Sequence, residues 1–262
     1  STAGEILKRH GEVRPRRRGR FKGRGNGPWP EALYANAVWT ADHKGWFRTG
    51  DGKRCEPLTV LDLKSRYCLA LEAHSSTAQA QAWPVFARLF KIHGLPDAIR
   101  SDNGPPFAGA GVSGLTGLAV RFLKLGIGLQ RIDPGKPQQN GCHERFHGTL
   151  LPLEAKPAAT LAAQQTAFGA FRREYNEERP HEALGQTPPC DHYRASLRPL
   201  PRRIPEPGYP AGAALRRVRS NGEIKWRGEL IHVSDALIGE WVAVEETEES
   251  AAQVRFYSHI VG

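Results

Sequence analysis

Residues 131–147 read RIDPGKPQQNGCHERFH, a polar loop that leads into a helix starting near Asn140 or Gly141 and carrying Glu144. A second stretch, RSDNGPPF at residues 100–107, places Asp102 directly after a short strand of the buried type. A third, VWTADHKGW at residues 38–46, places Asp42 in an apolar run typical of a strand. Each stretch delivers one carboxylate where one element gives way to the next, so we expect the three acids to form one site.

The pattern around these acids alternates between strand and helix signals. Three strands come first, and helices and strands then alternate, which predicts an α/β domain with a mixed sheet. The expected strands are residues 35–39, 56–63, 65–73, 97–101 and 127–132, and the expected helices are residues 77–93, 115–125, 140–151 and 160–178. A proline-rich linker at 199–210 follows. Five short strands between residues 215 and 257 then predict a small β-barrel.

The formal charge of +10 and the pI near 9.7 suit a polyanionic partner, although a merely basic protein would have the same totals. The placement of the charge is more informative. Residues 1–30 are rich in Gly, Pro and Arg, which favours an extended arm laid along a DNA backbone over a simple solvated tail. The arm's candidate DNA contacts are Arg16, Arg17, Arg18, Arg20 and Lys22. The predicted domains are therefore this arm, a core at 31–198, the linker at 199–210 and a barrel at 211–262.

The four cysteines have no C-x-x-C spacing, so neither a zinc site nor a disulfide framework is indicated, and reduced thiols in a cytoplasmic protein are expected. No signal peptide and no long apolar run predict a membrane segment. The sequence contains no Met, which indicates a fragment and leaves room for a further domain, such as a helix-turn-helix, before Ser1.

Three carboxylates arranged in this way suit phosphodiester chemistry. Two divalent cations about 3.5–4 Å apart activate an oxygen nucleophile and stabilise the leaving oxyanion, and Mg²⁺ needs few protein carboxylates for this role. Asp42 would bridge both ions, Asp102 would hold one, and Glu144, near the positive end of its helix, would hold the other. A lone Asp at a strand end is more often a turn former, so the set of three carries the prediction.

The same residues resemble those of the integrase-core DDE transposases of bacterial insertion sequences, relatives of the retroviral integrases. The matching motifs are WTADHKGWF around Asp42, HGLPDAIRSDNGPPF around Asp102, PGKPQQNGCHERFH around Glu144, and YNEERPHEALGQTPP at residues 175–189. The resemblance covers about residues 35–195. It implies a ribonuclease H-like catalytic domain and a requirement for Mg²⁺ or Mn²⁺, with two ions per site. The small β-barrel beyond it is expected to be SH3-like. The resemblance also implies DNA 3′-end cleavage followed by strand transfer by a homo-oligomer that binds element ends and target DNA, in a nucleoid-associated location.

Two features depart from the family pattern. The spacing between Asp102 and Glu144 is longer than the commonest one, and the excess is expected in the flexible loop at 108–114. The family also places a basic residue two helical turns after the glutamate, where this chain has Leu151. Lys136, Arg145 or His147 are the expected substitutes. Further candidate DNA contacts are Gln139, Asn140 and His143 around the same loop, and Arg216 and Arg217 after the linker.

Two alternative functions remain open at this stage. The first is a metal-dependent nuclease that cuts DNA but does not join it. The second is a DNA-binding protein that keeps the fold without catalysis; Leu151 supports it, whereas the complete Asp42, Asp102 and Glu144 set speaks against it. Neither a membrane nor a small-molecule substrate is expected for any of the three.

Overall fold

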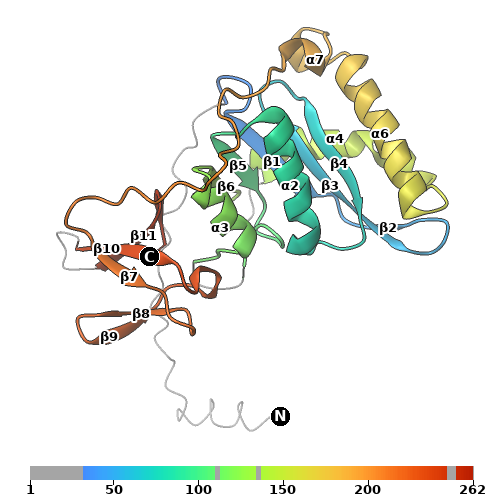
Figure 1. Cartoon of the computed structure of the whole chain (residues 1–262). Coiled ribbons are helices and arrows are strands. Elements are labelled where there is room, and N and C mark those ends of the chain that lie inside the picture. The colour runs from blue at the N-terminus through green and yellow to red at the C-terminus, as the bar shows by residue number, and fades with distance from the viewer. Residues whose placement is uncertain (1–31, 110–112, 134–136, 247–251, 262) are drawn as a thin grey trace, which may run out of the picture.

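The computed structural model describes residues 32–109, 113–133, 137–246 and 252–261. The basic arm with its five candidate DNA contacts, and Lys136 in the loop before Glu144, lie outside these residues. Figure 1 shows a central sheet covered by helices, with a smaller group of C-terminal strands beside it.

The central sheet is mixed, as the sequence predicted. Its strands are β1 (Val38–His43), β2 (Phe47–Arg48), β3 (Arg54–Asp62), β4 (Cys68–His74), β5 (Ala98–Ser101) and β6 (Gly128–Arg131). They lie in the order β2-β3-β1-β5-β6, and β4 pairs with β3. The pairings of β3 with β1, β2 and β4 are antiparallel, whereas β1–β5 and β5–β6 are parallel. The two carboxyl ends of β1 and β5 therefore meet at one edge.

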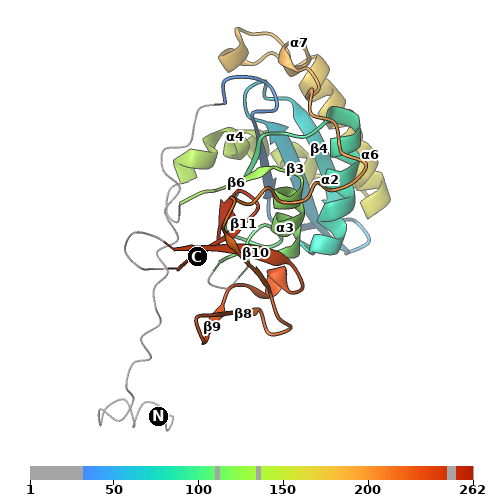
Figure 2. The ribbon, with the colours of Figure 1, turned by 60° about the vertical axis from the view of Figure 1, so that its left-hand side comes forward.

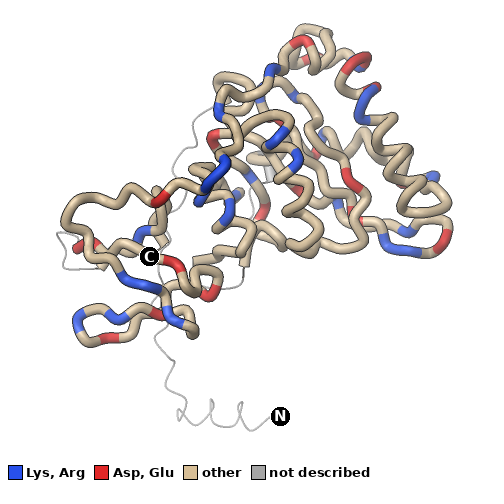
Figure 3. The backbone as a smooth tube through the Cα atoms, in the orientation of Figure 1, with Lys and Arg blue, Asp and Glu red and all other residues tan. Residues whose placement is uncertain are grey.

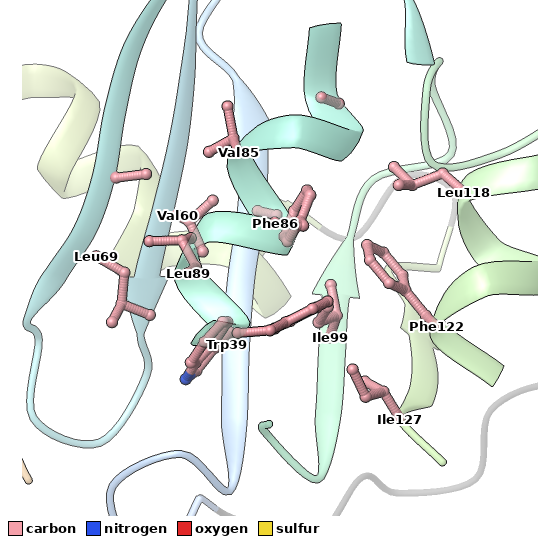
Figure 4. Close-up of a cluster of buried hydrophobic side chains, with 14 of the residues drawn as sticks. Trp39, Val60, Leu69, Val85, Phe86, Leu89, Ile99, Leu118, Phe122 and Ile127 are labelled. Atoms are coloured by element: carbon pink, nitrogen blue, oxygen red, sulfur yellow. The ribbon is translucent and has the colours of Figure 1, made fainter. Parts of the chain in front are cut away.

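Alternate residues of β1 face two different helical layers. Trp39 and Ala41 join the core formed with α2 (Gln79–His93) and α3 (Gly117–Lys124), and Figure 4 shows Trp39 in this cluster with Phe86, Ile99 and Phe122. Thr40 and Asp42 point to the opposite face. The helices of that layer are α4 (Gly141–Thr149), α5 (Leu151–Ala155) and α6 (Leu161–Glu177), and a separate cluster packs there around Leu61 and Phe146.

Local signals account for several helix ends. The side chains of Thr116 and Thr160 accept hydrogen bonds from backbone N–H groups in the first turns of α3 and α6. Gly94 ends α2 with a φ of 73°, a conformation that favours glycine. The helix predicted to reach Leu151 ends at Thr149 instead. Pro152 explains the break, because it has no backbone N–H to donate to the carbonyl oxygen of Gly148 and its ring crowds that carbonyl.

The C-terminal strands form two sheets. β7 (Ala214–Arg217), β10 (Trp241–Glu246), β11 (Ala252–Phe256) and β12 (His259–Ile260) make one, and β8 (Glu223–Trp226) and β9 (Glu229–His232) make the other. The strands expected from the sequence are present, but the described residues do not close into the predicted barrel. Short elements that were not predicted are β2, β12, α5 and α7 (Pro189–His192).

The C-terminal sheets share a core with α3. Val218, Ile224, Leu237 and Val242 pack in one cluster with residues of α3 such as Leu123. Both ribbon views place these strands next to that helix (Figures 1 and 2). Helix α3 is therefore buried on two sides, with Leu118 and Phe122 in the central core and Ala119, Val120 and Leu123 in the second. Among the described helices, none is long and apolar enough to cross a membrane.

Candidate metal centre

Asp42 and Asp102 lie beside each other at the edge of the sheet. In the parallel pairing of β1 with β5, Ala41 is aligned with Ser101, and each aspartate is the next residue of its chain. Both aspartates are partly buried. The negative charge of Asp102 raises the pKa of Asp42, which shows that the two carboxylates interact. The sheet register thus brings together two acids that are 60 positions apart in the chain.

Glu144 approaches this pair from the first turn of α4. Its side chain is exposed, and its charge makes a further, smaller contribution that raises the pKa of Asp42. The residue before the helix, Asn140, is buried and donates a hydrogen bond from Nδ2 to Oδ2 of Asp42 at 3.3 Å. Asn140, one of the candidate DNA contacts, therefore reaches the acid site itself.

The electrostatics of the site favour a bound cation. The pKa of Asp42 is raised to about 7. Burial is the largest cause of this rise, and the negative charge of Asp102 is the second. Burial also raises the pKa of Asp102, although a hydrogen bond from the backbone N–H of Gly104 lowers it in part. Carboxylates that disfavour each other's charge in this way are stabilised by a positive ion placed between them. The oxygen atoms offered here are the ligands that Mg²⁺ prefers.

A network of hydroxyl and imidazole groups lies beneath Asp42. His143 is fully buried, and its Nδ1 lies 2.8 Å from Oγ1 of Thr40 while its Nε2 contacts Oγ1 of Thr59. His147 also contacts Thr59, through Nε2 at 2.9 Å. Burial lowers the pKa of His143 well below its usual range and that of His147 to about 3, so both rings are neutral.

Asp42, His143 and His147 form a second set of metal-ligand types. One ligand atom of each lies within 4.8 Å of the others, in the described part of the chain. The sequence reasoning missed this cluster, although His143 and His147 have the i, i+4 spacing that places two side chains on one helix face. Both ring nitrogens of His143 already have hydrogen-bond partners, so a metal ion would have to replace Thr40 or Thr59 to reach this ring.

The burial of His143 corrects the expectation that it contacts DNA. With 0% of its surface exposed, its side chain lies under the site rather than on the surface. Gln139 is also engaged within the protein, because its Oε1 accepts from the backbone N–H of Asp133 at 2.8 Å and its Nε2 donates to Oδ2 of the same residue at 3.1 Å. Arg145, in contrast, is exposed on α4.

The remaining candidates lie away from the acids. Figure 3 shows the basic residues of β7 in the C-terminal sheet, apart from the central one. There the guanidinium of Arg216 lies 5.1 Å from the ring centre of Trp226, and Arg217 donates to the carbonyl oxygen of Gly239. Leu151, where a cation was expected, is 57% exposed and begins α5 rather than continuing the helix of Glu144.

Parts of this chain are similar to known proteins. The integrase core domain family matches residues 125–189, which include Glu144. The 31.7 kDa protein of insertion element IS407 from Burkholderia multivorans is 29% identical over 158 residues, which cover 60% of this chain and 54% of that protein. The 39.2 kDa protein of insertion element IS476 from Xanthomonas euvesicatoria is 28% identical over 157 residues, covering 59% and 43%. The chain thus spans about half the length of these relatives.

Among solved structures, a chain of the simian T-cell lymphotropic virus intasome, in complex with the PP2A regulatory subunit B56 gamma, has a TM-score of 0.51. The sequence identity is 17%, and the match covers 90% of this chain and 84% of that one. At this level of identity the likeness concerns the fold alone. It supports the mixed α/β architecture of a retroviral integrase.

Proposed function

Because the chain carries an integrase-core match and is homologous to proteins of bacterial insertion elements, we propose that it is a DNA transposase of the DDE type. Its catalytic and metal-binding residues are Asp42, Asp102 and Glu144. The observation that carries this proposal is the alignment of β1 with β5, which sets Asp42 beside Asp102 where the charge of Glu144 also acts on Asp42.

The proposed reaction has two steps. Water attacks a phosphodiester at the element end, so that one P–O bond forms, another breaks and a 3′-hydroxyl is released. That hydroxyl then attacks a phosphodiester of target DNA, so that a new P–O bond joins the two DNAs while the bond to the target's 3′-oxygen breaks and a target 3′-hydroxyl is released. Two Mg²⁺ ions, or Mn²⁺ in their place, would supply activation of the nucleophile and charge stabilisation of the leaving oxygen. The chain's own part is to hold Asp42 and Asp102 on rigid strand ends and to direct Glu144 toward them from α4.

The acid set suits this reaction better than the set of Asp42 with the two histidines. Mg²⁺ prefers oxygen ligands, whereas imidazole suits zinc and other transition metals. Both nitrogens of His143 are occupied by threonine hydroxyl groups. We assign His143 and His147 to positioning: together with Thr59 they fix α4, and hence Glu144, against the strand of Asp42.

The proposed partners are element-end DNA, target DNA and further copies of the chain. One solved structure of similar fold is a chain of an intasome, which supports an assembly on DNA. The domains proposed are the basic arm at 1–30, the ribonuclease H-like core at 31–198, the linker at 199–210 and an SH3-like unit at 211–262. Arg145, Arg216 and Arg217 are exposed or partly exposed and remain the proposed DNA contacts among the described residues. A nucleoid-associated place in the cytoplasm would follow from this partner.

Replacement of Asp102 tests the assignment. Asp102→Asn keeps the size of the side chain but removes a metal-binding charge, so Mg²⁺-dependent strand transfer should be lost while DNA binding is retained. Asp191→Asn, at an exposed position of α7, is the matched control and should behave as the wild-type protein. Strand transfer by the Asp102→Asn protein at the wild-type rate would refute the proposal.

The same assay separates transposase from the two alternatives. Labelled element ends are incubated with a supercoiled plasmid and Mg²⁺, and the products are resolved by size. A transposase yields plasmid joined to the label, a nuclease yields cut ends without joining, and an inert DNA-binding protein yields neither. Mn²⁺ soaked into crystals with DNA should appear between Asp42, Asp102 and Glu144; its absence there would favour the inert protein.

A further inference from the structure

An ion pair lies at the edge of the acid site. Lys44 comes two residues after Asp42, and its backbone N–H donates to the carbonyl oxygen of Pro57 at 3.2 Å, which fixes it to the sheet. Its Nζ lies 2.6 Å from both carboxylate oxygens of Glu154, which belongs to α5. The two side chains are 11% and 21% exposed. Among the described residues, the acid that pairs with this cation is Glu154 of the neighbouring helix.

Lys44 is also close to the groups around Asp42. Burial is the main cause of the lowered pKa of His147, and the charge of Lys44 is the second. A ligand atom of His147 lies in turn within 4.8 Å of one of Asp42. The ammonium group therefore lies one side chain away from the carboxylate that is proposed to bridge the metal ions. A DNA strand bound at the acids would present a phosphate charge every few ångströms, so a neighbouring phosphate can reach this region.

Helix α5 is weakly attached to the rest of the protein. It has five residues, and none of them is buried. Leu153 is partly buried against the cluster around Phe146, whereas Leu151 is 57% exposed. An element with so little buried surface opens at low cost, and the ion pair from Lys44 is one of its main attachments. Glu154 can therefore leave Lys44 and become hydrated without disturbing the core.

We propose that Lys44 binds a DNA phosphate next to the acid site. In the absence of DNA, Glu154 forms an ion pair with Lys44, and the DNA phosphate displaces Glu154 when it binds. The exchange keeps the lysine charge paired, because one anion replaces another. A lysine ammonium binds phosphate as a point charge and does not need a fixed geometry. The inference rests on the proposed function, since the ligand is the DNA held at Asp42, Asp102 and Glu144.

Four variants of the full chain test the exchange by fluorescence anisotropy with a labelled mixed-sequence DNA duplex over a range of salt concentrations. Glu154→Gln removes the competing charge and should tighten binding roughly two- to five-fold. Lys44→Gln should weaken binding and reduce the slope of log K against log salt by about 0.9, the value for one lost phosphate contact. In Lys44→Gln/Glu154→Gln, the gain from the glutamate change should disappear.

The matched control is Glu72→Gln, which breaks the ion pair of Glu72 with Arg88 on another part of the surface. It should leave binding unchanged. Thermal melting of every variant checks that it folds, and the Glu154→Gln protein alone decides the matter if Lys44→Gln unfolds. The proposal is overturned if Glu154→Gln binds no more tightly than the wild type, or gains as much in the Lys44→Gln background.

This readout is independent of catalysis. If strand transfer survives in the Asp102→Asn protein but the Glu154→Gln effect holds, the catalytic assignment fails and Lys44 remains a DNA contact. If the reverse is found, the acids are catalytic and Lys44 has only a structural role.

Discussion

The hydroxyl group of Thr59 donates a hydrogen bond of 3.0 Å to the backbone carbonyl oxygen of Asp42. Because the Thr59 hydroxyl has a single hydrogen and donates it to this carbonyl, its oxygen Oγ1 can only accept from the histidines. Its two lone pairs therefore accept hydrogen bonds from Nε2–H of His143 and Nε2–H of His147. Nδ1 of His143 is then free to accept from Thr40. One buried hydroxyl on β3 therefore connects the strand of Asp42 to the helix of Glu144.

The first prediction concerns this hydroxyl. Thr59→Val keeps the shape of the side chain but leaves the imidazole N–H groups of His143 and His147 without their acceptor. Each buried polar group left unsatisfied costs about 1–3 kcal/mol, so we expect a loss of roughly 3 kcal/mol in the free energy of unfolding. Urea denaturation measures it. Thr59→Ser keeps the hydroxyl and should recover most of the loss, and equal stability of the two variants would contradict the network.

A second prediction follows from the pKa of Asp42. It is about 7 in the folded protein, above the value of about 4 for an unfolded chain. Asp42 thus binds more protons in the folded state between these limits, so its own contribution to the free energy of unfolding of the metal-free protein should fall as the pH rises from 4 through 7. Buried histidines with a lowered pKa, such as His147, contribute in the opposite direction. Asp42→Asn removes this penalty, so the variant should exceed the wild type at pH 8 by at most about 4 kcal/mol.

Denaturant unfolding in a chelator at several pH values measures the effect, with Asp191→Asn as the control. Mg²⁺ should stabilise the wild type at pH 8 and have a smaller effect on Asp42→Asn, because the bound ion compensates the buried charge. A difference in stability between Asp42→Asn and the wild type that stays constant between pH 4 and 8 would contradict the electrostatic interpretation of the site.

The sequence predicted most of the central fold because its elements carry regular hydrophobic patterns. The helix at 160–178 and the strand at 56–63 were close to α6 and β3. Elements of two to five residues, such as β2, α5 and α7, have too few residues for a pattern, and contacts with distant parts of the chain hold them. The end of α4 before Leu151 is different, since Pro152 signalled it in the sequence.

The acid site was predictable only in part, unlike the central sheet and its helices. The order of motifs indicated that Asp42, Asp102 and Glu144 meet, but the sequence did not reveal which face of α4 is buried. The structure turns His143 inward with Phe146 and leaves Glu144 exposed. That orientation depends on how α4 packs against β1 and β3. The residues in contact there are more than 80 positions apart in the chain, as His143 and Thr59 are.

A third prediction concerns the open edge of β4, whose ladder partner is β3. The side-chain amide of Asn176 on α6 receives a hydrogen bond from the N–H of Cys68 at 2.8 Å and donates to its carbonyl at 3.0 Å. Asn176 is 3% exposed, so Asn176→Ala should lower the free energy of unfolding by about 2 kcal/mol. Gln165 bonds Ala73 and Leu71 in the same way but is partly exposed.

Water can replace the amide of Gln165, so Gln165→Ala should cost less than Asn176→Ala. Chemical denaturation of the two variants side by side gives the comparison. The opposite order would show that helix α6 protects the strand edge mainly through Gln165.

The fourth prediction concerns the attachment of the C-terminal sheets. Their core includes Leu123 of α3 and the fully buried Leu237, and Lys124 pairs with Glu240 at 2.5 Å across the same contact. A core shared in this way should hold the two parts together without a covalent link, because separation would expose the second apolar side of α3. Brief trypsin treatment at the exposed residues Arg202 and Arg203 provides the cut.

After cleavage, the core and the C-terminal fragment should elute together in gel filtration. Leu123→Asp places a charge in the shared core and should release the C-terminal fragment, since an unpaired buried carboxylate costs several kcal/mol. Arg203→Lys keeps the tryptic site and should elute as the wild type. Fragments that separate without any substitution would show that the C-terminal sheets form an independent domain on a flexible linker.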